Sequence, residues 1–244
     1  MMQNVTIVIP GFNNKKWYKR NLDSVLAQKY KSFKAIYTDD CSTDGTSGLV
    51  SSYLKNNDGS NRITFIQNTA RVGALENLYN MIHSCDDNDI VITLDADDWF
   101  PHDRVLDRVV KEYSQHDTWL TYGQYKEHPH GTMGCSSQIP QNIIDKSIYR
   151  KSGWYSSHLR TFKVWLFKKI KKEDLMHNGK FFASAWDLAM MFPMLEMSGP
   201  RARFIPEVLY IYNIDNPLND HKVDAKKQQA FARIVRGRAK YSLL

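Results

Sequence analysis

The sequence predicts an α/β protein with a mostly parallel central sheet flanked by helices. Apolar, strand-like segments begin near residues 5, 33, 62 and 90, and a helix-like segment separates each pair. A repeat of about 28 residues is typical of βαβ units, in which a helix returns the chain to a parallel strand. With 244 residues and a hydrophobic content of 42%, the chain can bury a full core. We therefore expect one compact domain.

The first four strands are expected over residues 5–10, 33–38 and 62–66 and from residue 90 onward. Asn13 or Asn14 is expected to cap the first helix, and Ser42 or Thr43 the second. No strand is followed by Gly-x-Gly-x-x-Gly or by a Walker Gly-Lys-Ser/Thr. The sequence therefore gives no support to a dinucleotide-binding or P-loop protein.

After residue 100 the pattern changes. A helix is expected over residues 103–115, followed by a strand over 118–127. A later helix opens at Trp186 and Asp187 and reaches about residue 197, with Pro193 bending it. A last strand is expected over residues 203–212.

Carboxylates follow the fourth strand directly, in the stretch Ile-Val-Ile-Thr-Leu-Asp-Ala-Asp-Asp-Trp of residues 90–99. If the chain stays extended, Asp95 and Asp97 point to one side and Ala96 and Asp98 to the other. Two neighbouring carboxylates suit a hard cation such as Mg²⁺ or Mn²⁺, which can in turn hold a diphosphate. The alternative is a solvated acidic turn that caps a helix beginning near residue 101.

The net charge of +7 is concentrated at the C-terminus. Residues 222–244 contain seven basic residues and one acid. They predict a helix with Val223, Phe231, Ile234 and Val235 on its apolar side. Its basic face is either simply solvated or docks on a membrane or an acidic acceptor.

The compartment is predicted from what the sequence lacks. No apolar run approaches the roughly 20 residues of a membrane span, and no basic and apolar leader precedes the first strand. Cys41, Cys85 and Cys135 are few and lack metal-ligand spacing, so reduced thiols are expected. We expect a cytoplasmic protein, with peripheral membrane contact through the basic tail as an open possibility.

Four motifs together resemble those of a known enzyme family. In order they are Val-Ile-Pro-Gly-Phe-Asn, Tyr-Thr-Asp-Asp-Cys-Ser-Thr-Asp-Gly-Thr, Asn-x-x-Arg-x-Gly and Leu-Asp-Ala-Asp-Asp. This set resembles the inverting family 2 glycosyltransferases with the GT-A fold. The resemblance implies a nucleotide-sugar donor, usually a UDP-sugar, a divalent metal, Mn²⁺ or Mg²⁺, and transfer to a hydroxyl of a glycan or another acceptor.

The resemblance also implies roles for the donor-site residues. It places Pro10 and Phe12 around the base and Asp40 on the uracil edge. The remaining donor contacts that it implies are Arg71 near the nucleotide, Asp95 on the ribose or metal side, Ala96 within the same motif, and Asp97 on the metal. Asp40 could instead be a turn former, as Asp44 could.

Further roles fall on the second half of the chain. Family members carry a general base at the head of a late helix, often as Glu-Asp, and here Trp186-Asp187 stands in its place. Asp187 is therefore the candidate base, although it could merely favour the helix N-terminus. His221 is a candidate metal or diphosphate ligand, and His158 and Arg160 are candidates for the diphosphate or donor sugar.

The expected organisation is a single domain with a nucleotide-sugar half (residues 1–115), an acceptor and catalytic half (116–221) and the basic C-terminal helix (222–244). Two rival functions remain open. A sugar nucleotidyltransferase would share the sheet and the metal-binding aspartate, but the chain lacks a glycine-rich basic loop for a triphosphate. A nucleic-acid-binding module would use the basic tail, but acidic strand ends argue against a basic groove across the sheet.

Overall fold

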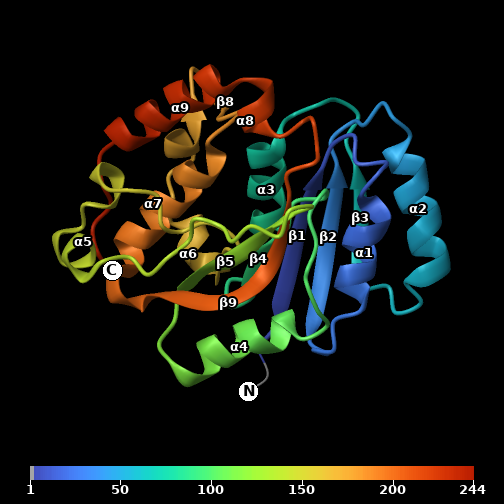
Figure 1. The fold of residues 1–244 in the computed structure, drawn as a ribbon, viewed down its shortest axis with the longest axis horizontal. Coiled ribbons are helices and arrows are strands. Elements are labelled where there is room, and N and C mark those ends of the chain that lie inside the picture. Colours follow the sequence, from blue (N-terminus) through green and yellow to red (C-terminus); the bar gives the residue numbers. More distant parts are fainter. Residues whose placement is uncertain (1–2) are drawn as a thin grey trace.

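The computed structural model describes residues 3–244, apart from the side chains of residues 220 and 221. Its central sheet has seven strands in the order β3-β2-β1-β4-β6-β5-β9 (Figure 1). These are β1 (Val5–Gly11), β2 (Phe33–Asp39), β3 (Ile63–Gln67), β4 (Ile90–Thr93), β5 (Leu120–His128), β6 (Thr161–Lys163) and β9 (Ala202–Asn213). Neighbouring strands are parallel except at β6, which is antiparallel to β4 and β5. The mostly parallel α/β fold is confirmed, and β4 occupies the middle of the sheet.

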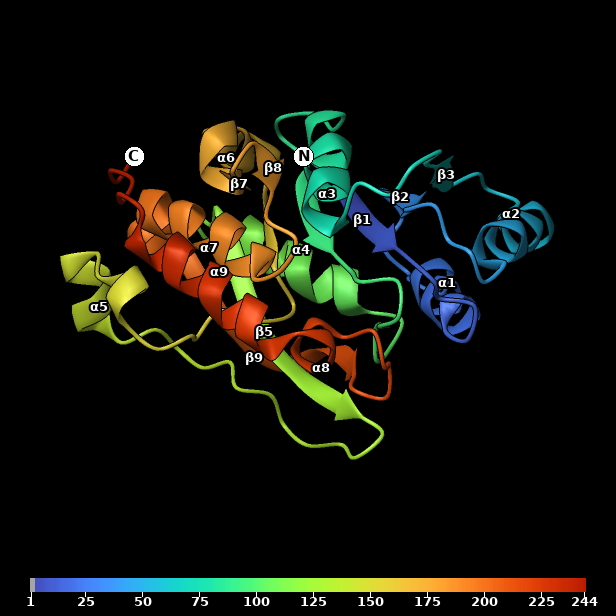
Figure 2. The same ribbon diagram turned by 90° about the horizontal axis from the view of Figure 1, so that it is seen from above.

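Helices cover both faces of this sheet. The helices are α1 (Tyr18–Leu26), α2 (Thr46–Asn57), α3 (Ala74–His83), α4 (Val105–Gln115), α5 (Gln141–Lys146), α6 (Val164–Lys168), α7 (Trp186–Ser198), α8 (Asp220–Val223) and α9 (Ala225–Gly237), with short 3₁₀ turns at Tyr149–Lys151, Lys172–Leu175 and Gly199–Arg201. Alternate residues of β1 enter different cores: Val8 packs with α3, α6 and α7, whereas Ile7 and Ile9 pack with α1, α2 and α4. In Figure 2, α1 and α2 lie at one end of the sheet, and α7 and α9 run side by side at the other.

The C-terminal segment is tied to the second half of the chain. Phe231 and Ile234 of α9 pack against the core of α7, and Val235 is buried in it. Leu244 N donates to Met197 O at 3.1 Å. The predicted apolar side of the tail is thus confirmed except at Val223, which is 65% exposed because it lies before α9 begins. Within the described residues, no helix combines the length and apolarity that crossing a bilayer demands.

One local prediction was wrong, and two short elements were missed. The predicted side chains do not cap the first two helices. Helix α1 begins at Tyr18 without a side-chain cap, after a turn in which Trp17 N donates to Asn14 O. Ser42 does not cap α2, because its Oγ donates to Asp39 Oδ1 at 2.5 Å. Strand β6 was not predicted, because three residues give no periodicity. A two-residue hairpin, β7 (Met176–His177) with β8 (Lys180–Phe181), was also missed.

Candidate functional site

The carboxyl ends of β1, β2 and β4 meet at one edge of the sheet. Ala96 N donates to Pro10 O at 3.3 Å, and Asp40 N donates to Gly11 O at 2.7 Å. The first, second and fourth motifs therefore lie together, as expected for parallel strands. Pro10 is buried, and the Ala96 side chain is 1% exposed in the core beneath the edge. These two residues shape the backbone of the site, and their donor contacts stay a prediction.

Asp40 organises the loop that follows β3. Its Oδ1 accepts from Asn68 Nδ2 and Val72 N, both at 2.9 Å, and its Oδ2 accepts from Gly73 N at 2.8 Å. Burial alone would raise the pKa of Asp40, but these hydrogen bonds outweigh it, and the pKa lies below its usual value. Asp40 is therefore a carboxylate near neutral pH, and three of its acceptor positions are already used.

Arg71 and Phe12 lie beside this carboxylate. The Arg71 guanidinium lies 3.8 Å from the centre of the Phe12 ring, and its Nε is 4.0 Å from Asp40 Oδ2. The Arg71 side chain is 65% exposed. The structure thus brings together Phe12, predicted around the base, Asp40, predicted on the uracil edge, and Arg71, predicted near the nucleotide, as a ring, an anion and a cation at the ends of β1 and β2.

The acidic motif after β4 forms a turn instead of an extended strand. Strand β4 ends at Thr93, and Asp98 N donates to Asp95 O at 3.0 Å. Asp98 is fully buried, where it accepts from Tyr210 Oη at 2.5 Å and from Asn213 N at 2.7 Å. The extended backbone expected beyond Thr93 is therefore wrong, but the expected grouping of side chains is found: Asp95 and Asp97 are partly exposed, whereas Ala96 and Asp98 are buried. The helix-cap alternative is also wrong, because Asp98 binds β9 and α4 begins only at Val105.

Asp97 is the partly exposed carboxylate of this turn. Its Oδ2 accepts from Asn216 Nδ2 at 2.6 Å. Burial raises the pKa of Asp97, and the Asn216 hydrogen bond offsets only part of the effect. The pKa of Asp98 is raised much further, by burial and then by Asp97 and Asp95. Negative charge is thus poorly compensated here.

A divalent cation fits these residues. Among the described side chains, no lysine, arginine or histidine nitrogen lies within 4.0 Å of the Asp97 or Asp98 carboxylate. The donor set is oxygen only, which suits Mg²⁺ or Mn²⁺. In the described part of the chain, no group of three or more His, Cys, Asp or Glu side chains converges as a metal-binding set. A cation at Asp97 would therefore take its remaining ligands from water or a bound diphosphate.

His158 lies just before β6 on an aromatic stack. Its ring stacks on Tyr210 at 4.3 Å and on Tyr212 at 5.4 Å, measured between ring centres. Its Nε2 lies 3.3 Å from Arg160 Nη2. Burial, and secondly Arg160, hold the pKa of His158 well below its usual value, so the ring is neutral and can accept from the guanidinium.

Arg160 connects this stack to α7. The residue is only 3% exposed, and its Nη2 lies 3.4 Å from Asp187 Oδ2. Its Nε and Nη1 are buried and have no hydrogen-bond partner among the residues described. The Trp186 ring lies 5.5 Å from the guanidinium. A buried cation with two donors that no described residue accepts from carries an unmet hydrogen-bonding cost.

Asp187 lies in the first turn of α7, and its side chain is 23% exposed. Ala185, not Asp187, occupies the N-cap position, and no side chain caps the helix. The carboxylate is therefore not used as a cap, although an acid in the first turn still favours the helix. It is accessible to a ligand and is oriented by Arg160.

The family is decided by comparison with known proteins. The chain matches the family described as "Glycosyl transferase family 2" over residues 6–175, which is more than half of its length. The chain belongs to glycosyl transferase family 2. Glycosyltransferase GlyG of Streptococcus pneumoniae serotype 4 is 22% identical over 223 residues, which are 87% of this chain and 71% of GlyG.

Solved structures agree on the GT-A fold. TarS 1-349 of S. aureus in complex with UDP-GlcNAc has a TM-score of 0.67 and 18% identity, and the match covers 96% of this chain and 65% of that one. The mannosyltransferase PcManGT of Pyrobaculum calidifontis, in complex with GDP-Man and Mn²⁺, has a TM-score of 0.64 and 19% identity, with 99% and 66% covered. This chain thus spans just under two thirds of each of these two solved chains.

This family 2 glycosyltransferase also contains site residues that its sequence did not reveal. Tyr210 and Asn213 anchor the acidic turn, and Asn216 binds Asp97. Asn216 lies five residues before His221, the candidate ligand of this segment, so the sequence held a signal for it. The side chain of His221 lies outside the described residues, and its metal role stays a prediction.

The aromatic residues near the start of α7 mainly pack in the core. The Trp154 ring lies edge-on to Phe192 at 5.6 Å, and Trp154, Tyr155 and Trp186 all pack against the α7 core.

Proposed function

We propose that this protein is a metal-dependent, inverting hexosyltransferase that moves a sugar from a UDP-hexose to an acceptor hydroxyl, with Asp187 as general base. One observation carries the proposal: the buried Arg160 reaches Asp187 at 3.4 Å while its own carbonyl accepts from Thr93 N at 3.2 Å, at the end of β4. Arg160 therefore contacts the candidate base through its side chain, and it contacts the end of β4, next to the acidic turn, through its backbone.

The donor would bind across the ends of β1, β2 and β4. Phe12 and Arg71 offer a ring and a cation to the base, and Asp40 Oδ2 offers a remaining acceptor position to its N–H edge. Asp95 would contact the ribose or the metal, and Asp97 would hold Mn²⁺ or Mg²⁺. When bound, the metal would neutralise charge on the departing diphosphate.

The acceptor would lie on the α7 side of the donor. Asp187 would take the proton of the acceptor hydroxyl while that oxygen attacks the anomeric carbon from the face opposite the diphosphate. Arg160 orients Asp187, and its unused Nε and Nη1 would donate to donor oxygens as negative charge develops. Because the His158 ring is neutral, it would accept a hydrogen bond from the Arg160 guanidinium and would not itself bind the anion.

Residues 1–115 would thus form the donor half and residues 116–221 the acceptor half. Arg160, which belongs to the acceptor half, would lie where the two halves meet. A cytoplasmic location, inferred from the sequence, is part of the same proposal. No described feature favours a nucleotidyltransferase or a nucleic-acid-binding module over this function.

The test is calorimetric titration of UDP and of UDP-, GDP- and TDP-sugars, with Mn²⁺ and then with EDTA. We expect metal-dependent binding of UDP and one UDP-sugar, lost in Asp97→Ala. Asp86→Ala is the matched control, because Asp86 is an exposed carboxylate near the opposite end of β4. Near-normal donor affinity in Asp97→Ala would refute the metal role, and binding of GDP- or TDP-sugars alone would refute the UDP donor.

A further inference from the structure

The basic C-terminal region is not used by the proposed donor site or base. Helix α9 contains four basic residues and no acid. One of them, Arg236, is used internally, donating to Arg150 O and Ser152 O at 2.8 Å each. Lys226 and Lys227, together with Lys222 of α8, are exposed. We call these three lysines the basic rim.

The basic rim is free of close counter-charges within the described structure. None of its three ammonium groups lies within 4.0 Å of a described carboxylate. Asp215, an acid near Lys222, is itself paired with Lys16 at 3.0 Å. Asp224 uses its carboxylate to accept from Lys227 N at the start of α9. Lys222 Nζ donates to Ile214 O, and Lys227 Nζ lies 5.8 Å from the centre of the Phe231 ring, but neither contact neutralises the charge, so the positive charge of the rim is available to a ligand.

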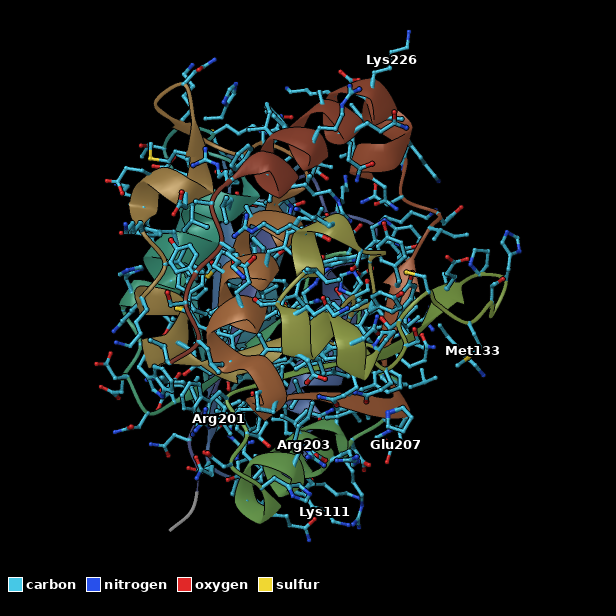
Figure 3. The ribbon with its side chains drawn as sticks, turned by 90° about the vertical axis from the view of Figure 1, so that its left-hand side faces the viewer. Lys111, Met133, Arg201, Arg203, Glu207 and Lys226 are labelled. Carbon is cyan, nitrogen blue, oxygen red and sulfur yellow. The ribbon has the colours of Figure 1, made fainter. Side chains whose placement is uncertain are left out.

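The rim follows directly after the loop that binds the acidic turn. The loop that contains Asn216, bound to Asp97, leads within six residues to Lys222. Helices α8 and α9 lie at the top of Figure 1, above the central strands, and Lys226 projects from the end of α9 in Figure 3. The path from the Asp97 turn to α9 is therefore short.

The amino-terminal end of α9 is also the end nearest to Asp187. The Phe231 ring lies 5.5 Å from Phe182, which precedes α7, whereas Arg236 lies over Phe192, further along α7, at 5.1 Å. The two helices therefore run in the same direction, side by side (Figure 2). The end of α9 that contains Lys226 and Lys227 is thus on the same side as the start of α7, where Asp187 lies.

The position of the apolar side of α9 helps to decide whether the basic side binds a membrane surface or a polyanion in solution. A helix that lies in a membrane surface presents its apolar side to the lipid. Here Phe231, Ile234 and Val235 face the protein core instead. The exposed side of α9 offers charge without an apolar face, which fits a polyanion in solution better than a bilayer.

We propose that the acceptor is an anionic glycan, and that the basic rim of Lys222, Lys226 and Lys227 binds its charged groups while one of its hydroxyls reaches Asp187. This inference rests on the proposed function, because it assigns the substrate class of the same site. Lysine suits such a role as a flexible point charge that tolerates irregular spacing of anions.

The test compares a charged and a neutral glycan with the same backbone. Protein saturated with UDP and Mn²⁺ is titrated with dextran sulfate oligomers and with neutral dextran oligomers of equal length. Wild type should bind the sulfated oligomer at least about tenfold more tightly. The triple variant Lys222→Gln, Lys226→Gln, Lys227→Gln should lose that preference, and the slope of log affinity against log salt should flatten by about two.

A matched variant removes three exposed lysines elsewhere, Lys31→Gln, Lys55→Gln and Lys111→Gln. Lys111 lies at the opposite end of the molecule from Lys226 in Figure 3. An equal loss in this control would overturn the proposal, as would equal affinity of wild type for both oligomers. Binding to vesicles of anionic lipid without binding to dextran sulfate would overturn it in favour of a membrane.

A UDP titration of each sample separates the two proposals. Unchanged UDP affinity in the rim variant, with lost dextran sulfate binding, supports the acceptor inference. If wild type fails to bind any nucleotide or nucleotide sugar, the proposed function fails, whatever the dextran sulfate result.

Discussion

Replacing Arg160 with methionine should stabilise the ligand-free protein and disable transfer. The guanidinium is 3% exposed, and its Nε and Nη1 lack partners among the described residues. Each buried unsatisfied donor costs about 1–3 kcal/mol, so the pair costs about 2–6 kcal/mol. The substitution also removes two long hydrogen bonds, to His158 at 3.3 Å and Asp187 at 3.4 Å, worth about 1 kcal/mol each.

The balance favours Arg160→Met by about 2 kcal/mol, or about 4–8 °C in Tm for a chain of this size. Because a missing donor to developing negative charge costs about 10²–10³ in kcat, transfer should fall by that factor. Urea unfolding gives the first quantity, and release of UDP from the donor gives the second. A variant less stable than wild type by more than about 1 kcal/mol, or one with unchanged kcat, would refute the reasoning.

Arg150→Met is the matched control of opposite sign. Arg150 is also buried, but it is fully paired, donating to Glu196 at 2.7 and 2.9 Å and to Val235 O at 2.8 Å. Its removal leaves the buried Glu196 charge without its cation, which costs about 3–5 kcal/mol. The same unfolding measurement should therefore move in opposite directions for the two arginines. A gain in stability in Arg150→Met would contradict the explanation by pairing.

Three further predictions follow from the same contacts. Asp187→Asn should leave UDP affinity unchanged but lower kcat by about 10²–10⁴, and turnover at the wild-type rate would exclude Asp187 as the base. Tyr210→Phe removes the 2.5 Å hydrogen bond to buried Asp98 and should cost about 1–3 kcal/mol in urea unfolding; an unchanged unfolding midpoint would show that the bond contributes nothing. The pKa of Asp97 is raised in the folded protein, so the folded protein keeps a proton that the unfolded chain loses near pH 4. The free energy of unfolding therefore falls as the pH rises from about 4 through the folded-state pKa of Asp97. Asp97→Asn, measured by thermal unfolding without metal, should therefore gain stability relative to wild type between pH 4 and pH 8, and a constant difference would contradict the raised pKa.

The parallel half of the fold was predictable because its signals are local. Strands β1 to β4 begin at or within one residue of the predicted positions, since each is an apolar segment bounded by turn residues. The meeting of Pro10, Asp40 and Ala96 followed from one topological rule, that parallel strands end at the same edge.

Predictions failed where a residue had a distant competitor for its polar group. Ser42 was expected as a helix cap, but its hydroxyl donates to Asp39, and its Oγ accepts from Asn13 N at 2.8 Å. The chain was expected to stay extended through Asp98, but it turns there, and Tyr210, 112 positions later, binds Asp98 in the core. A sequence read locally cannot rank such partners against a cap or an extended strand.

Strand β6 shows most clearly how the two halves depend on each other. Its three residues pair with β4 on one side and β5 on the other, so its identity as a strand comes wholly from long-range pairing. The same pairing fixes Arg160, because Arg160 O accepts from Thr93 N as the chain enters β6. A donor half cut at residue 115 would therefore lack the cation beside the acidic turn and leave the β4 edge unpaired. For this reason the proposed donor and acceptor halves are not independent units, and the proposed catalytic centre depends on β6, which joins them.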